Sequence, residues 1–203
     1  PLGNYIADAM LDRYKSAGAT LAVMNGGGIR ASLPSTYKVA DTSLRRAGTP
    51  YDLVVGDVYS VLPFNNRCVV RSITGDVLWQ MLEHAVYTMP DARGRFLQVA
   101  GIEFTWKESA APSARVQSIK LPDGSTMTRA IRDGDPAAWA TFAAKEFTIV
   151  LNDYNNSGGD GYAMLVEATP SPAGDLLTDV LLEYIKTHPV ADADGTERIV
   201  RQQ

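Results

Sequence analysis

Residues 147–162 read FTIVLNDYNNSGGDGY, an apolar run that passes directly into a polar loop. The run at 147–151 is rich in β-branched residues and is typical of a buried strand. The eleven residues at 152–162 hold three glycines, three asparagines and two aspartates, which is a costly composition to order for a mere connection. We therefore expect a ligand-binding loop. In it, Asp160 stands between two glycines and can accept both hydroxyls of a ribose, while Tyr154 can stack on a flat base.

A second strand-to-loop junction lies at residues 20–30, TLAVMNGGGIR. Residues 20–24 are β-prone, and the three glycines that follow cannot continue a regular element without a large entropic cost. A tight turn alone would account for the glycines. They also let the backbone approach a ligand closely, and the neighbouring Arg30 supplies a forked donor for a phosphate. Asn25 offers a donor and an acceptor to a base or a sugar.

The same glycines formally match the dinucleotide fingerprint G-x-G-x-x-[GA]. Two features argue against a dinucleotide-binding oxidoreductase. The sequence at 32–34, SLP, cannot start the helix that should face the pyrophosphate. No predicted strand ends in an acidic residue about 20 positions further on.

The rest of the chain alternates between helical and strand-like segments without a linker or a repeat. An amphipathic helix is predicted at 4–17, opened by Asn4 and stopped by Gly18. Further helices are predicted at 77–87, 137–145 and 175–187, and strands at 69–73, 96–106 and 115–127, the last interrupted by a turn at 122–124. We predict the α+β class, with a mixed sheet and packed helices in one domain spanning residues 1–203.

Composition excludes several functions. The 203 residues carry a formal net charge of −4, which argues against a nucleic-acid polymer or an anionic membrane as partner. A single cysteine, Cys68, forms no intrachain disulfide. With only two histidines, His84 and His188, the chain offers no zinc pattern and no catalytic triad. All three residues are interpreted as ordinary packing or helix-end residues. The chain begins with PLGN rather than with methionine, as expected for a piece of a longer or processed protein.

Four motifs stand in order along residues 2–162: LGNYIADAM at 2–10, NGGGIR at 25–30, VLPF at 61–64 and NDY…GGDGY at 152–162. Together they resemble the C-terminal domain of the 5′-nucleotidase family, and FLQVAG at 96–101 is similar to a strand of that family. The resemblance implies an extracytoplasmic phosphohydrolase (periplasmic, secreted or at the cell surface). Its N-terminal metallophosphoesterase domain would hold two divalent metal ions and perform the hydrolysis. The present chain would lack that domain, hold no metal or catalytic residue of its own, and be inactive alone.

Seven positions match the substrate-binding residues of the family: Asn25, Gly28, Arg30, Phe64, Tyr154, Gly159 and Asp160. The resemblance implies that the two aromatic residues clamp the base and that the aspartate holds the ribose hydroxyls. The arginine would hold the phosphate, the asparagine the base or sugar, and the two glycines would permit close backbone approach. Two clamping faces at about 1–3 kcal/mol each, less ordering costs, predict high-micromolar to millimolar affinity for a nucleoside.

Two departures from the family pattern leave alternatives open. The family usually has Phe where Tyr154 stands, and Gly-Asn where this chain has Asn65-Asn66. The tyrosine hydroxyl would change base preference or favour the related 2′,3′-cyclic nucleotide phosphodiesterases; a UDP-sugar hydrolase is a further possibility. An aromatic residue in a turn such as that around Phe64 is more often a plug of the core. A separate alternative is a non-catalytic interaction module that keeps the fold and has lost its substrate; the presence of Arg30, Phe64, Tyr154 and Asp160 together argues against it.

Overall fold

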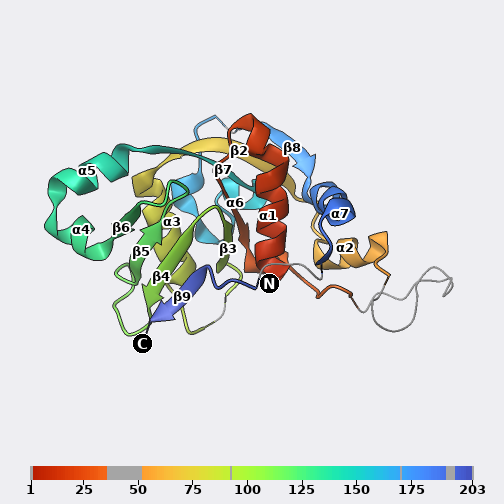
Figure 1. Ribbon diagram of the computed structural model, residues 1–203, viewed down its shortest axis with the longest axis horizontal. Helices are drawn as coiled ribbons and strands as arrows, with labels where there is room; N and C mark the ends of the chain where they lie inside the picture. Colours follow the sequence, from red (N-terminus) through yellow and green to blue (C-terminus); the bar gives the residue numbers. More distant parts are fainter. Residues whose placement is uncertain (1, 36–51, 92, 170, 191–194, 203) are drawn as a thin grey trace.

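The computed structural model describes residues 2–35, 52–91, 93–169, 171–190 and 195–202. The sequence predicts a Pro- and Gly-bearing loop between the glycine turn and residue 51, and it falls largely at positions 36–51, outside these ranges. The described residues form two mixed sheets with helices packed on and between them (Figure 1). This arrangement confirms the predicted α+β class.

Sheet A has the strand order β3-β1-β7-β2-β8. Its strands are β1 (Leu21–Asn25), β2 (Arg67–Thr74), β3 (Leu97–Ala100), β7 (Glu146–Asn152) and β8 (Ala173–Leu176). Strands β1 and β7 run parallel, and the other neighbours are antiparallel.

Sheet B has the order β6-β5-β4-β9, with β4 and β9 parallel. Its strands are β4 (Glu103–Lys107), β5 (Val116–Lys120), β6 (Thr126–Thr128) and β9 (Ile199–Gln202). The α-helices of the described residues are α1 (Leu2–Tyr14), α2 (Val55–Val61), α3 (Gly75–Val86), α4 (Arg129–Gly134), α5 (Pro136–Ala144), α6 (Asp153–Asn156) and α7 (Leu177–Thr187).

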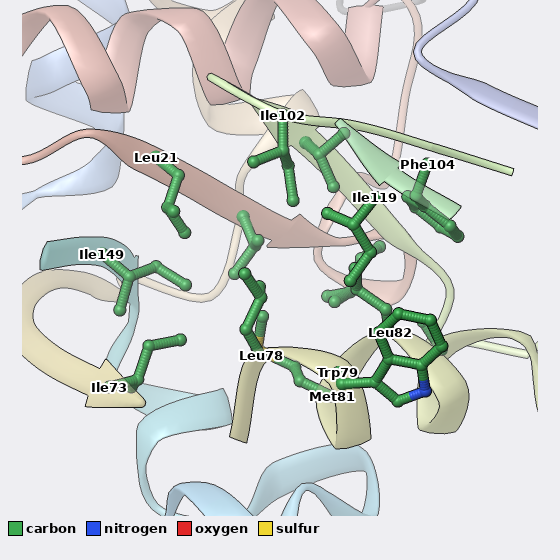
Figure 2. Close-up of a cluster of buried hydrophobic side chains, with 14 of the residues drawn as sticks. Leu21, Ile73, Leu78, Trp79, Met81, Leu82, Ile102, Phe104, Ile119 and Ile149 are labelled. Atoms are coloured by element: carbon green, nitrogen blue, oxygen red, sulfur yellow. The ribbon is translucent and has the colours of Figure 1, made fainter. Parts of the chain in front are cut away.

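Strand β1 is covered on both faces of sheet A, which explains why its first four side chains, at residues 21–24, are all apolar. Leu21 and Val23 point into a cluster shared with α3 and sheet B, where Leu78, Trp79 and other side chains of α3 fill the space between the sheets (Figure 2). Ala22 and Met24, on the opposite face, pack in the cluster formed with α1, α2 and α7. The edge of sheet A at which β1 ends is therefore supported from both sides.

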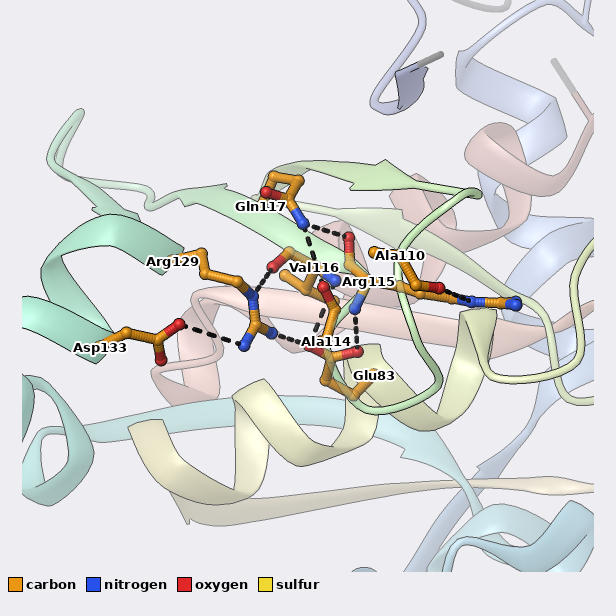
Figure 3. A network of polar contacts seen from close by, with 8 residues as sticks. All are labelled: Glu83, Ala110, Ala114, Arg115, Val116, Gln117, Arg129 and Asp133. Atoms are coloured by element: carbon orange, nitrogen blue, oxygen red, sulfur yellow. Dashed lines mark hydrogen bonds and ion pairs between the residues drawn. The ribbon is translucent and has the colours of Figure 1, made fainter.

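A buried carboxylate fixes α3 to sheet B. The side chain of Glu83 accepts hydrogen bonds from the backbone N–H groups of Arg115 (3.0 Å) and Val116 (3.2 Å), and forms an ion pair with Arg129 (Figure 3). Burial raises the pKa of Glu83 above its ordinary value. These contacts fix the position of the last turn of α3, which also carries His84.

Several predicted elements are confirmed within a few residues, among them α1, α3, β2 and β7. Gly18 ends the first helical segment with a φ of +87°, as the sequence predicts. The predicted N-cap at Asn4 is wrong. Helix α1 already includes Leu2, and Asn4 is buried within its first turn.

Two predicted elements are divided differently in the structure. The segment 96–106 forms β3 and β4 in different sheets, because Gly101 turns the chain with a φ of +80°. Only glycine fits there, since a Cβ at this position would come within 2.2 Å of the Thr20 carbonyl oxygen. The segment 175–187 begins as an edge strand: Leu176 pairs with Arg67 in sheet A, and α7 starts only at Leu177. Helices α2 and α4 were not predicted.

Candidate functional site

Four loops meet at one edge of sheet A because of the directions of its strands. Parallel strands β1 and β7 end there, at Asn25 and Asn152. The antiparallel neighbours begin at the same edge, since Cys68 of β2 pairs with Asn152 and Leu97 of β3 pairs with Asn25. Segments far apart in sequence, around residues 26–30, 63–66, 93–96 and 153–161, are thereby brought together.

A pocket of about 480 Å³ lies among these loops. It is lined by Asn25, Gly27, Gly28, Arg30, Phe64, Asn66, Gly94, Tyr154 and Asp160. Six of the seven predicted site residues are in this lining. The seventh, Gly159, lies directly beneath Tyr154, where a Cβ would come within 2.6 Å of the tyrosine ring and 2.5 Å of the Tyr154 carbonyl oxygen.

Two aromatic side chains of the pocket are exposed. Phe64 is 58% and Tyr154 45% accessible to solvent. Phe64 therefore does not plug the core, which is the role most common for an aromatic residue in such a turn. Large apolar side chains held at a concave surface are typical of ligand-binding sites.

Every polar group of Asp160 has a partner. The Tyr154 hydroxyl accepts a hydrogen bond from the Asp160 backbone N–H and donates one to Asp160 Oδ1, both over 3.1 Å. Asn25 Nδ2 donates to its Oδ2 over 2.7 Å, and His84 Nε2 lies 2.9 Å from its carbonyl oxygen. The carboxylate orientation is therefore set before a ligand arrives. Each of its two oxygens retains acceptor capacity.

The contacts of Asp160 belong to a closed ring of hydrogen bonds. Asn25 Oδ1 accepts from Asn152 Nδ2 over 2.8 Å, and Asn152 Oδ1 caps α6 by accepting from the backbone N–H of Asn155 over 2.8 Å. Helix α6 carries Tyr154, whose hydroxyl closes the ring at Asp160. The ring thus joins the ends of β1 and β7 to the pocket-lining tyrosine and aspartate.

Arg30 lies at the exposed part of the pocket. Its backbone N–H donates to Val61 O over 2.8 Å, which joins the glycine turn to the end of α2. Its guanidinium Nη1 is 3.4 Å from the carbonyl oxygen of Gly27, a weak contact that leaves the other donors of the fork for solvent or a ligand anion. The turn at Gly26–Gly28 is a single 3₁₀ turn, and Ile29 is extended. The helix required by the dinucleotide fingerprint does not follow in residues 29–35.

Sequence reasoning did not select five residues that the structure places in or beside the pocket: Asn66, His84, Gly94, Asn152 and Tyr162. Gly94 is recognisable only from its neighbours in space, since a Cβ on Gly27 would come within 2.8 Å of its Cα. His84, taken as a packing residue, instead contacts the Asp160 backbone from α3. One signal in the sequence could have identified Asn152: it is a polar residue that directly follows the apolar run at 147–151.

The remaining chemistry-bearing residues lie away from the pocket. Cys68 is buried, and burial raises the pKa of its thiol to about 12, which makes it a poor nucleophile at neutral pH. His188 follows α7 and stacks on Tyr184. Within the described ranges, no three His, Cys, Asp or Glu side chains are grouped closely enough to hold a metal ion. None of the helices in these ranges has the length and apolar character needed to cross a membrane.

A larger hollow of about 580 Å³ adjoins the pocket and shares Asn66 and Tyr154 with it. Among the described residues, its lining includes the carboxylates Asp153 and Glu167 and no basic side chain. We place the candidate site in the smaller pocket, because only that pocket combines the exposed aromatic rings with the fixed carboxylate and an arginine.

Comparison with known proteins identifies the family of the chain. The family model described as "5′-nucleotidase, C-terminal domain" matches residues 1–167. The trifunctional nucleotide phosphoesterase YfkN of Bacillus subtilis is 33% identical over 169 residues, which cover 83% of this chain and 10% of that protein. The 5′-nucleotidase of Bos taurus is 29% identical over 192 residues, which cover 91% of this chain and 30% of that protein.

Solved structures give the same result. The 5′-nucleotidase precursor of Thermus thermophilus superposes with a TM-score of 0.78 at 30% identity, over 100% of this chain and 35% of that one. The NAD nucleotidase of Haemophilus influenzae shares the fold, with a TM-score of 0.71 at 20% identity over 100% of this chain and 33% of that one. The chain spans less than half the length of each of these relatives. It belongs to the family of 5′-nucleotidase C-terminal domains.

Proposed function

We propose that this chain is the nucleoside-binding part of a 5′-nucleotidase-type phosphohydrolase. One observation carries the proposal. Two exposed aromatic side chains, an arginine and an aspartate with every polar group already paired line the same pocket, although they come from separate loops. Packing of the core does not require these four side chains together. Binding of a molecule with a flat ring, a diol and a phosphate does require such a set.

Phe64 and Tyr154 would bind the base between them. Both rings are accessible and line the pocket, and base–aromatic stacking is worth about 1–3 kcal/mol per base. Asn25 and Asn66 supply amide groups beside them. Asn25 Nδ2 is already committed to Asp160 and its Oδ1 to Asn152. This supports a role in holding the sugar-binding carboxylate at least as much as in reading the base.

Asp160 would accept hydrogen bonds from the 2′- and 3′-hydroxyls of the ribose. Tyr154 occupies one acceptor position of Oδ1 and Asn25 one of Oδ2, so one position on each oxygen remains for a cis-diol. Arg30, at the exposed side of the pocket, would attract the 5′-phosphate. The glycine turn allows the backbone to approach: at Gly28 a Cβ would come within 3.1 Å of Asn25 Oδ1 and within 2.3 Å of Met24 Cε.

Hydrolysis would take place on another part of the parent protein. The described residues contain no group of three metal-ligating side chains, so they do not fit the metal pair that the family implies. This chain would bind the nucleoside and present its phosphate to a metallophosphoesterase domain, and would be inactive alone. We also propose an extracytoplasmic location, which the snake venom 5′-nucleotidases and the Listeria monocytogenes cell wall protein among its relatives support. Fractionation of the source cells tests it.

Ligand-observed NMR of the 203-residue chain with adenosine and AMP, without metal, tests the binding proposal. We expect saturable binding with a dissociation constant in the high-micromolar to millimolar range, lost in the Phe64→Ala/Tyr154→Ala double variant. Binding that survives in the double variant would contradict the clamp. No binding by the native chain at millimolar ligand would favour a non-catalytic interaction module.

A second candidate keeps the same domain in an enzyme for 2′,3′-cyclic nucleotides or UDP-sugars. The presence of Tyr rather than Phe at position 154, and the similarity to a trifunctional phosphoesterase, favour keeping it. Titration with AMP, UDP-glucose and 2′,3′-cyclic AMP separates the two. A cyclic phosphate lacks the free diol and brings a negative charge toward Asp160, so we expect AMP to bind best.

A further inference from the structure

His84 contacts the backbone of Asp160 from a different part of the fold. Its Nε2 lies 2.9 Å from the Asp160 carbonyl oxygen. Because a carbonyl oxygen can only accept, Nε2 carries the proton and donates. His84 belongs to α3, 76 residues before Asp160, and is not in the lining of the pocket.

Asp160 needs such support because its backbone conformation is unfavourable. Its φ is +57°, in the left-handed region; Gly161 directly after it has a φ of +85°, and Gly158, two residues before it, has a φ of +91°. A Gly-Gly-Asp-Gly segment has many alternative backbone conformations open to it when unrestrained. Rotation of the Asp160 peptide would carry the carboxylate away from Asn25 and Tyr154.

His84 is itself held firmly. Its ring packs edge-on against Tyr162, with centroids 4.7 Å apart and an interplanar angle of 70°. Tyr162 is fully buried, and its hydroxyl donates to Arg95 O over 2.5 Å. The preceding residue, Glu83, fixes the same turn of α3 to sheet B. The imidazole therefore presents its N–H from a rigid helix to the single 3₁₀ turn at Gly159–Gly161, in which Asp160 itself has a non-helical backbone conformation.

We propose that His84 is a positioning residue for the sugar-binding carboxylate of Asp160. By fixing the Asp160 carbonyl it sets the peptide from which the side chain projects, and the site thereby selects ligands with a free cis-diol, that is, ribonucleosides and their 5′-phosphates. The inference rests on the proposed function and extends it to a residue outside the pocket.

Comparison of adenosine with adenine tests this role, because only adenosine carries the diol. Dissociation constants are measured by ligand-observed NMR for the native chain, His84→Phe and His84→Gln. Phe keeps an aromatic ring against Tyr162 without the donor, and Gln places an amide N–H near the position of Nε2. We expect His84→Phe to weaken adenosine binding about three- to tenfold, as for the loss of one hydrogen bond, and to leave adenine binding unchanged. His84→Gln should restore most of the difference.

His188→Phe is the matched control, since His188 lies at the end of α7 and contacts Tyr184 instead. This variant should change the affinity for neither adenosine nor adenine. Equal weakening of adenosine and adenine in His84→Phe, or an unchanged ratio, would overturn the positioning role while leaving the clamp intact. If His84→Phe and His84→Leu both fail to give a folded spectrum, the role is structural and the inference is wrong. Absence of adenosine binding by the native chain would instead contradict the proposed function.

Discussion

The hydroxyl of Tyr154 makes two hydrogen bonds to one residue, accepting from the Asp160 backbone N–H and donating to Asp160 Oδ1, each over 3.1 Å. The same arrangement recurs outside the pocket. The Tyr14 hydroxyl accepts from the Asp175 N–H over 2.8 Å and donates to Asp175 Oδ2 over 3.0 Å. One pair joins a pocket-lining ring to a pocket-lining carboxylate, and the other joins α1 to β8. The second pair is therefore a natural control for the first.

Tyr154→Phe separates stacking from the hydroxyl. The ring still stacks, but the Asp160 N–H loses its acceptor and Oδ1 its donor. We expect adenosine to bind about three- to tenfold more weakly, with adenine nearly unchanged. Tyr14→Phe should lower the free energy of unfolding by about 1 kcal/mol, the equivalent of that change in affinity, and should leave the affinities for adenosine and adenine unchanged. If Tyr154→Phe binds adenosine as well as the native chain, the carboxylate does not depend on this link.

Phe64→Ala separates ligand binding from stability. Because Phe64 is 58% exposed, its removal should change the free energy of unfolding by no more than about 0.5 kcal/mol. Loss of one stacking face should make the free energy of adenosine binding less favourable by about 1–3 kcal/mol. Thermal unfolding and NMR titration measure the two effects. Val55→Ala, at an exposed apolar side chain outside the pocket (57% accessible), is the control. A large fall in stability with unchanged affinity would make Phe64 a packing residue.

Asn152→Ala tests the ring of hydrogen bonds beneath the pocket. Asn152 is fully buried, and its loss leaves Asn25 Oδ1 without its donor and removes the cap of α6. We expect a destabilisation of about 1–3 kcal/mol in chemical denaturation, together with weaker adenosine binding. Asn152→Asp retains the cap acceptor, but it turns the donor to Asn25 into an acceptor and adds a buried charge, so it should be at least as destabilising. An unaltered affinity in both variants would show that the ring does not govern the site.

Arg30→Gln tests where the phosphate binds. Adenosine carries no phosphate, so its affinity should stay the same while that of AMP falls to the level of adenosine. The AMP preference of the native chain should also decrease as salt is added, because the interaction is exposed to solvent. Arg67→Gln, at an exposed arginine that donates to Gly174 O, is the control. An AMP preference that persists in Arg30→Gln would place the phosphate elsewhere.

Asp175 gives a pH-dependent contribution to stability. The Arg13 guanidinium, followed by the Tyr14 hydroxyl, lowers the pKa of Asp175 below its ordinary value of 3.8. The folded state therefore favours the charged form, so the stabilisation is present above about pH 4 and is lost as the pH falls through the lowered pKa. The pair is partly exposed, and the effect should stay below about 1 kcal/mol. Melting temperatures of the native chain and Asp175→Asn should converge as the pH falls through the lowered pKa; a constant difference would contradict the linkage.

The local elements follow from the sequence where periodicity and a terminator agree. Helix α3 has apolar residues at helical spacing, and Gly18 stops the first helical segment because the left-handed conformation there suits glycine. The strand predicted at 96–106 shows the limit. Most of its residues favour extended backbone, and only the contact between Gly101 and the Thr20 carbonyl shows that the chain must turn into a second sheet.

The candidate site divides in the same way. The residues by themselves pointed to Asn25, Arg30, Tyr154 and Asp160, because a diol, a base and a phosphate each demand a particular side chain. The resemblance to the 5′-nucleotidase family added Gly28, Phe64 and Gly159, and six of the seven positions line one pocket. The support of that pocket depends on strand order. Asn152 reaches Asn25 only because β7 lies parallel to β1, and His84 reaches Asp160 only because α3 packs beneath the loop. The sequence by itself determined which groups are available for a ligand. Tertiary structure decided which of them hold one another in place, since hydrogen bonds between residues 76 to 135 positions apart depend on packing that no local pattern encodes.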